Sequence, residues 1–77
     1  MTTEDETDIV GTFGECLRTR RRRKRWSARQ LSEVSGISQS AIYGWEHDRS
    51  LPAYEYRMAL RLALGVPRDA DYGWWKP

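Results

Sequence analysis

The sequence predicts a small all-α domain of four to five short helices, and three observations support this. Apolar residues recur at spacings of three and four, as they do on one face of a helix. Thr12, Ser27 and Ser38 stand where three such helices would begin, and their side chains can cap a helix N-terminus. Gly36 and Gly65 stand where two helices would end, in the position that usually adopts a left-handed conformation.

Length and composition restrict the classes of protein to consider. The 77 residues are enough for one small domain with a compact core. Cys16 is the only cysteine and His47 the only histidine, so we expect neither an internal disulfide nor a metal site. No apolar run is long enough to cross a membrane, and the acidic N-terminus is not a secretory signal. We therefore expect a cytoplasmic protein without membrane association.

Charge is segregated along the chain. The formal net charge is +2, but residues 1–8 hold four acidic residues and no basic one. Residues 18–29 hold seven arginines and one lysine and no acidic residue. This segregation predicts a basic docking surface and an acidic tail. We expect residues 1–8 to be a disordered, solubilising tail; the alternative is a mimic of DNA that covers the basic surface.

The first helix begins near Thr12, where Glu15 completes a capping box. Leu17 faces the core, and Gly14 permits close packing against a neighbouring helix. The helix continues into the basic run at residues 18–25, which extends around its whole circumference. At least one basic side chain of this run must therefore point inward.

The second helix is framed by a second capping box, formed by Ser27 and Gln30. Leu31 and Val34 give it an apolar stripe, and it ends at Gly36. A third helix follows directly, so two short helices are joined by a tight turn. This is the helix-turn-helix unit that proteins use to read the major groove of DNA.

The third helix has two distinct faces. Ala41, Ile42 and Trp45 share the face that we expect in the core. The opposite face is small and polar and carries no acidic residue; it consists of Gln39, Ser40, Tyr43, Gly44 and His47. Such a face suits a helix laid in a groove better than a solvated helix, which would usually carry lysine and glutamate.

The fourth helix, at about residues 53–64, is apolar on more than one side. Leu60 and Leu64 form its core stripe. A second stripe needs a cover, and residues 67–77 form an aromatic tail that can fold back onto it or meet the same surface of a second copy. Candidate dimer or partner contacts are Met58, Leu62, Tyr72, Trp74 and Trp75. The chain thus divides into the acidic tail, a helix-turn-helix domain at residues 9–66 and the aromatic tail.

An ordered set of residues through all four helices resembles a known family. These residues are Phe13, Gly14, Leu17, Arg21, Trp26, Ser27, Leu31, Gly36, Ile37, Ser38, Ile42, Trp45, Glu46, Pro52, Leu60, Leu64, Gly65 and Val66. Over residues 13–66 the chain is similar to the lambda repressor/Cro (XRE-type) helix-turn-helix family. The resemblance implies a lambda-repressor-like bundle, a bacterial or phage-encoded regulator, and a structural ion pair between Arg21 and Glu46.

The sequence also departs from the family pattern. Ala28 stands where relatives often carry a glutamine that contacts phosphate, so that contact is lost or moved to Arg29. Arg20 replaces an apolar residue of the first helix. Asp48 replaces a usual glycine after the third helix, so we expect the turn there to differ, and its charge would oppose a phosphate contact by Arg49.

The candidate site residues divide into two groups. The residues that we expect to contact bases are Gln39, Ser40, Tyr43 and Gly44. Of these, Gln39 can make a bidentate contact to adenine. The residues that we expect to contact phosphates are Arg18, Arg22, Arg25, Ser27, Arg29, Ser38 and Arg49. Neither a catalytic constellation nor a cofactor motif is present, so we expect no enzyme activity and no cofactor.

Together these observations predict a sequence-specific transcriptional regulator that binds double-stranded DNA. We expect a repressor that binds a palindromic operator as a homodimer, with the third helix in the major groove. One alternative is an antitoxin-like or adaptor protein that binds a protein partner through its Trp-rich tail. Another is binding of nucleic acid through charge alone.

Overall fold

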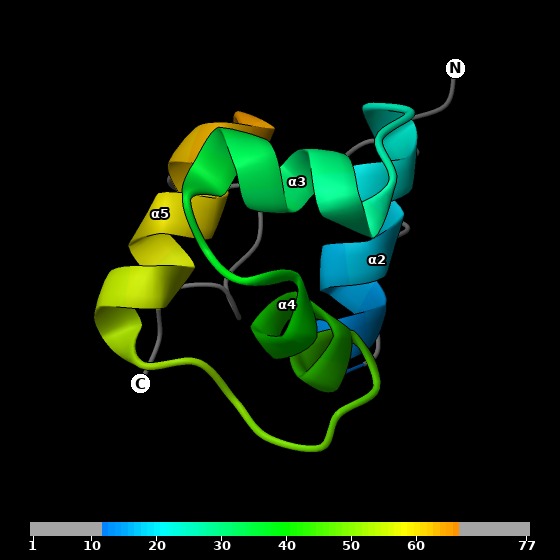
Figure 1. Ribbon diagram of the computed structural model, residues 1–77. Coiled ribbons are helices and arrows are strands. Elements are labelled where there is room, and N and C mark those ends of the chain that lie inside the picture. Colours follow the sequence, from blue (N-terminus) through cyan, green and yellow to red (C-terminus); the bar gives the residue numbers. More distant parts are fainter. Residues whose placement is uncertain (1–11, 67–77) are drawn as a thin grey trace.

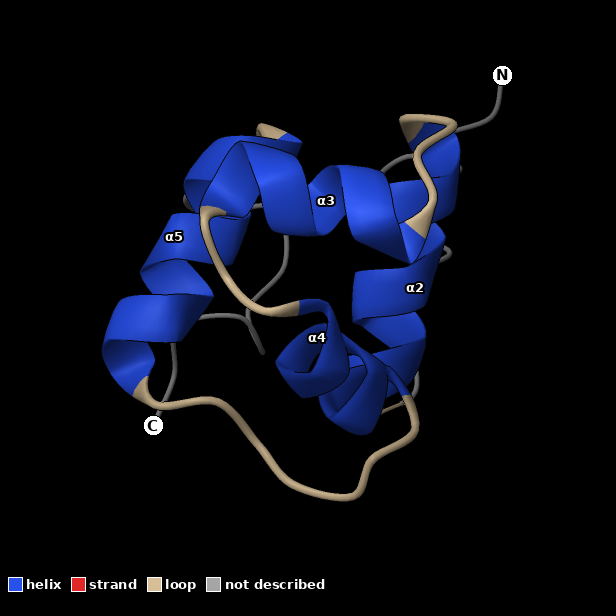
Figure 2. Ribbon diagram, viewed as in Figure 1, coloured by secondary structure: helices blue, strands red, loops and turns tan. Residues whose placement is uncertain are grey.

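A computed structural model describes residues 12–66, which form four helices around one core (Figure 1). The helices are α2 (Phe13–Arg23), α3 (Ala28–Ser35), α4 (Gln39–Glu46) and α5 (Tyr54–Leu64). Loops join them, and no strand occurs within this range (Figure 2). The predicted all-α class is therefore confirmed. The two tails, with Tyr72, Trp74 and Trp75, lie outside the described residues.

The helices cross one another rather than lying parallel. In Figure 1, α2 and α5 stand on opposite sides of the molecule, and α3 runs between them. Helix α4 packs against both α2 and α3, and α3 also packs against α5. The loop from α4 to α5 passes along one end of the bundle (Figure 1). This arrangement leaves one side of α4 without a covering helix among the described residues.

The caps expected from the sequence are all present. Both capping boxes are complete: each N-cap side chain accepts from the backbone three residues on, and that residue's side chain accepts from the N-cap backbone. At α4, Ser38 Oγ accepts from the backbone N–H of Ala41 at 3.1 Å. Gly36 and Gly65 end α3 and α5 with φ angles of 78° and 69°. Local sequence signals therefore fix the starts of α2, α3 and α4 and the ends of α3 and α5, whereas α5 begins after Ala53 without a side-chain cap.

The core is small, and most of its buried side chains are aliphatic. Leu17, Leu31, Ile42 and Leu60 are fully buried, one from each helix. Val34 was expected beside them, but that expectation is wrong, because its side chain is 54% exposed. The inward side of α3 runs through Ala28, Leu31 and Ser35, and Val34 lies about 90° away from the centre of that arc.

Gly14 allows α2 to pack directly against the end of α4. A Cβ atom on Gly14 would lie 2.4 Å from the carbonyl oxygen of Trp45 and 2.7 Å from that of Glu46. Real side chains do not approach backbone so closely, so no other residue fits here without moving a helix. The expectation that Gly14 permits close packing is confirmed, and the contact fixes the C-terminal end of α4.

Candidate nucleic-acid interface

Burial along α4 follows the two faces expected from its sequence. Ile42 and Trp45 are buried, and Ala41 is partly buried against the same core. Gln39, Ser40 and Tyr43 are exposed. Since the apolar face holds α4 to the core, the polar face is presented outward as a fixed surface.

The outward face of α4 is hollowed. An open depression of about 410 Å³ is lined by Gln39, Ser40, Tyr43, Gly44 and Arg49. A Cβ atom added to Gly44 would meet nothing within 4 Å. Packing within the described chain therefore does not require a glycine there, although glycine costs about 1 kcal/mol relative to alanine inside a helix.

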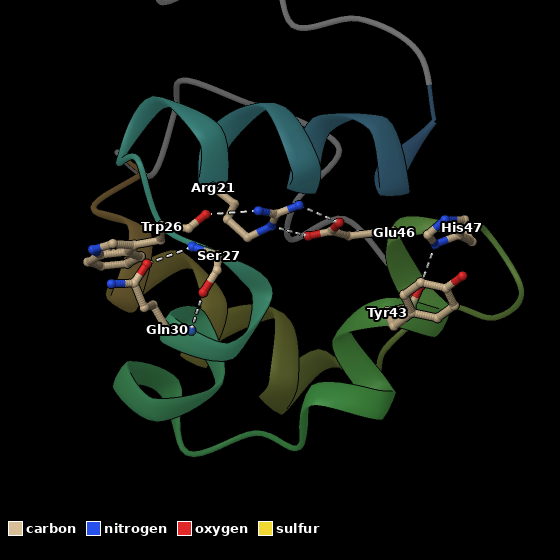
Figure 3. A network of polar contacts seen from close by, with 7 residues as sticks. All are labelled: Arg21, Trp26, Ser27, Gln30, Tyr43, Glu46 and His47. Carbon is tan, nitrogen blue, oxygen red and sulfur yellow. Dashed lines mark hydrogen bonds and ion pairs between the residues drawn. The ribbon is translucent and has the colours of Figure 1, made fainter.

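Tyr43 contacts the side chains of His47 and Arg49. Its ring centroid is 4.1 Å from that of His47, and the guanidinium carbon of Arg49 is 5.4 Å from the Tyr43 centroid. His47 Nδ1 lies 2.9 Å from the carbonyl oxygen of Tyr43, which ties the imidazole to the last turn of α4 (Figure 3). These contacts hold the Tyr43 ring at the edge of the hollow.

A buried ion pair anchors the other side of α4. Arg21 Nε donates to Glu46 Oε2 at 2.6 Å, and Nη2 donates to Oε1 at 3.0 Å (Figure 3). Arg21 Nη1 also donates to the carbonyl oxygen of Trp26 at 2.8 Å. Donating hydrogen bonds to the Glu46 carboxylate raises the pKa of Arg21 above its ordinary value, while burial opposes this shift. The pair that the family resemblance implies is thus formed, with Glu46 deep in the structure.

The candidate phosphate contacts lie at helix ends and turns, except for Arg18, which lies within α2. Arg22, Arg25, Ser27, Arg29, Ser38 and Arg49 are exposed, and Arg18 is partly buried. Arg29 forms an ion pair with Glu33, with 3.4 Å between Arg29 Nε and Glu33 Oε2. Both side chains are exposed to solvent. Ser27 and Ser38 use their hydroxyl oxygens as helix caps, which leaves the hydroxyl hydrogens free to donate.

The comparison with protein families agrees with this arrangement of helices. A family described as helix-turn-helix domain matches residues 12–71, which is most of the chain. The chain belongs to this helix-turn-helix family. The match is consistent with the resemblance to lambda repressor/Cro proteins seen in the sequence. No curated protein and no solved structure matched the chain.

Within this helix-turn-helix domain, α3 and α4 are the two helices of the motif and Gly36 lies in the turn between them. The second helix of such a motif is the one that enters the major groove of DNA. The family and the exposed polar face of α4 therefore both point to a DNA-binding regulator.

Sequence reasoning missed the role of Asp48 in the helix-turn-helix domain. Thr12 Oγ1 donates to Asp48 Oδ2 at 2.8 Å, and the backbone N–H of Gly14 donates to Oδ1 at 3.1 Å. The carboxylate thus lies at the N-terminus of α2, where partial positive charge favours it. We expected the negative charge of Asp48 to oppose a phosphate contact by Arg49. This opposition is reduced because the Asp48 carboxylate already accepts two hydrogen bonds. The expectation that the turn after α4 differs is wrong, because Asp48 adopts the left-handed backbone of a glycine, with a φ angle of 57°. The one available signal was an aspartate at a glycine position, since aspartate tolerates this conformation.

Sequence reasoning also missed Arg57, which is buried in α5. Its Nε donates to the carbonyl oxygen of Pro52 at 3.3 Å, and its guanidinium carbon lies 5.4 Å from the ring centroid of Phe13. Arg57 therefore links the α4–α5 loop to α2. No local pattern distinguishes it from the solvated arginines.

Residues 12–66 carry neither a metal cluster nor a membrane-spanning helix. No cluster of histidine, cysteine, aspartate and glutamate in that range is arranged to hold a metal ion. None of the helices described there has the length and hydrophobicity needed to span a lipid bilayer.

Proposed function

We propose that this helix-turn-helix protein is a sequence-specific transcriptional regulator that reads DNA by placing α4 in the major groove. The observation that carries the proposal is the outward face of α4, which is polar, hollowed and free of acidic side chains. A solvated helix would gain nothing from Gly44 in its middle, whereas a helix in a groove gains a closer approach to the DNA. We infer binding rather than catalysis, in the cytoplasm of a bacterium or of a phage-infected cell.

Base readout comes from the first turns of α4. Gln39 lies in the first turn, where residues of a recognition helix reach furthest into the groove. Its amide can donate to and accept from the edge of adenine. Ser40 can bond to a base or to a phosphate, and Tyr43 can contact a thymine methyl group or the sugar edge. Gly44 lets these groups come close to the helix backbone.

Phosphate contacts supply most of the affinity. The exposed arginines before α3 and after α4, with the capped N-termini of both helices, can neutralise phosphates on either side of the groove. Each neutralised phosphate releases counterions, so affinity should fall steeply with salt. This part of the interface carries no sequence information and fixes the register of α4.

We further propose that two copies bind together on a palindromic operator. One recognition helix reaches few base pairs, and a two-fold dimer doubles the site that is read. The support is an apolar face on α5, where Leu62 is 70% exposed, Tyr54 is also exposed and Met58 is partly exposed. Repression rather than activation is assigned by resemblance to the lambda repressor/Cro family.

A second candidate function rests on the same apolar face of α5. An antitoxin-like or adaptor protein would use this face, with Trp74 and Trp75 of the tail, to bind a different protein. That role predicts that Trp75→Ala abolishes capture of the partner and spares operator binding. The dimer proposal instead predicts that changes to this face weaken operator binding by the purified protein alone.

Competition binding tests the proposed readout. Unlabelled random duplex competes with a labelled bound site, and Gln39→Ala is compared with Arg49→Gln. We expect Gln39→Ala to lose about 1–3 kcal/mol of discrimination at one base pair. Arg49→Gln should weaken all sequences alike. If Gln39→Ala leaves sequence preference unchanged, binding through charge alone replaces the proposal.

A further inference from the structure

Asp48 closes α4 with a backbone conformation that normally belongs to glycine. Its φ angle is 57°, in the left-handed region. The backbone N–H of Asp48 donates to the carbonyl oxygen of Trp45 at 3.1 Å. The backbone N–H of Arg49 donates to the carbonyl oxygen of Gly44 at 2.9 Å. This is the pattern by which a left-handed residue reverses the chain at the end of a helix. The direction of the following residue is therefore set at Asp48.

That following residue is Arg49, which the turn directs back over α4. Its guanidinium carbon lies 5.4 Å from the Tyr43 ring centroid, and its side chain lines the hollow on the outward face. If the chain left α4 in another direction, Arg49 could not lie over Tyr43. The position of one basic group beside the recognition helix thus depends on the turn.

The turn is held from outside by α2. The Asp48 carboxylate accepts from Thr12 Oγ1 and from the Gly14 N–H, at the start of a helix that lies more than 30 residues earlier in the chain. Gly14 also lies where α2 packs closely against the end of α4. The left-handed conformation of Asp48 is therefore supported by contacts that a glycine at this position could not make.

We propose that Asp48 is a positioning residue for DNA binding, which holds the turn so that Arg49 reaches a phosphate beside α4. The inference rests on the proposed function, specifically on the phosphate contact of Arg49. Asp48 does not itself touch DNA, because its two carboxylate oxygens are bound to α2. A glycine would only permit the turn, whereas Asp48 also fixes it through its two hydrogen bonds to α2. We call this pair of hydrogen bonds the Asp48 clasp.

Two variants separate geometry from charge. Asp48→Asn and Asp48→Gly remove the same charge. Asparagine tolerates the left-handed backbone, and its amide can still accept from Gly14 and donate to Thr12. Glycine accepts the backbone without strain but has no side chain to make the clasp. Circular dichroism verifies that each variant is folded, and Asp48→Ser, whose shorter side chain cannot reach both partners, replaces Asp48→Gly if the latter is not.

The binding measurement is the affinity for a fixed duplex over a series of salt concentrations. We expect Asp48→Asn to keep the wild-type slope of log affinity against log salt. Asp48→Gly should make the slope shallower by about 0.9, which corresponds to the loss of one phosphate contact. Arg49→Gln should give the same reduction, and the double variant Asp48→Gly with Arg49→Gln should lose no more than Arg49→Gln alone.

A second measurement needs no DNA. In NMR spectra of the free protein, the Arg49 side-chain protons should be displaced by the ring current of Tyr43. Asp48→Asn should keep this displacement and Asp48→Gly should lose it. Equal salt slopes and equal Arg49 shifts in the two Asp48 variants would overturn the positioning role. An unchanged slope in Arg49→Gln would instead disprove the phosphate contact itself, and the role of Asp48 in binding would fall with it.

Discussion

Arg21 and Glu46 join the first described helix to the end of α4 through two parallel hydrogen bonds, of 2.6 and 3.0 Å. The exposed fractions of the two side chains are 14% and 4%. The guanidinium also donates to the Trp26 carbonyl oxygen, so it holds the α2–α3 connection as well. One arginine of a long basic run is therefore structural, while Arg22 and Arg25 of the same run are exposed.

Arg21→Ala should destabilise the protein far more than Arg22→Ala. Removing Arg21 leaves the buried Glu46 carboxylate without its partner, which should lower the free energy of unfolding by about 3 kcal/mol. Arg22 is exposed, so its removal should change that energy by less than about 0.5 kcal/mol. Thermal denaturation followed by circular dichroism measures both. Equal melting temperatures for the two variants would refute the structural role of the pair.

Gly44→Ala should make the protein more stable and its DNA complex weaker. Alanine gains about 0.5–1 kcal/mol of helix stability, and nothing within 4 Å opposes its Cβ. The same methyl group would hold α4 away from the DNA, so affinity should fall by about tenfold, or about 1.4 kcal/mol.

Gly14→Ala is the matched control, because it adds the same methyl group to another helix. Its Cβ would lie 2.4 Å from the Trp45 carbonyl oxygen, so it should destabilise the protein by about 1–3 kcal/mol. Denaturation and binding titrations measure both variants. If Gly44→Ala stabilises the protein without weakening DNA binding, α4 does not approach DNA closely at this position.

Features set by neighbouring residues could be predicted from the sequence. The capping boxes at Thr12 and Ser27, and the left-handed ends at Gly36 and Gly65, depend on residues within one helical turn. The two faces of α4 follow from helical periodicity in the same way. These signals were enough to predict the all-α class and to indicate which side of α4 faces outward.

Features set by distant residues could not be predicted. The Asp48 clasp joins residues 34 and 36 positions apart, and the burial of Arg57 depends on Phe13 and on the Pro52 carbonyl oxygen. The exposure of Val34 likewise depends on how α3 is rotated against its neighbours. Periodicity identifies candidate faces, but tertiary packing decides how wide the buried arc is.

Arg20→Leu should stabilise the protein. Arg20 Nε and Nη2 are buried and make no hydrogen bond to residues 12–66. Burying such donors without partners costs about 1–3 kcal/mol, and a leucine would remove that cost. We expect the melting temperature to rise, while Arg21→Leu should lower it because Glu46 loses its partner. A lower melting temperature for Arg20→Leu would show that its guanidinium is well partnered in solution.

Leu62→Lys should prevent the proposed self-association through α5 without unfolding the monomer. Leu62 is 70% exposed, so the change leaves the core intact and places like charges opposite each other in a two-fold interface through α5. Sedimentation equilibrium and binding to a half-site measure the two effects. We expect loss of the dimer, weaker binding to a full palindrome and unchanged half-site affinity. A dimer that persists in this variant would exclude α5 as the interface.

Selection of bound sites from random duplex DNA tests the central claim that α4 reads sequence. The wild-type protein should enrich a palindromic site whose half-sites are centred about 10 base pairs, or a multiple of that, apart. In parallel, Gln39→Ala should lose the preference for one base pair in each half-site and keep the others. Enrichment of no sequence by the wild-type protein, or of the same sequence by both proteins, would contradict the account.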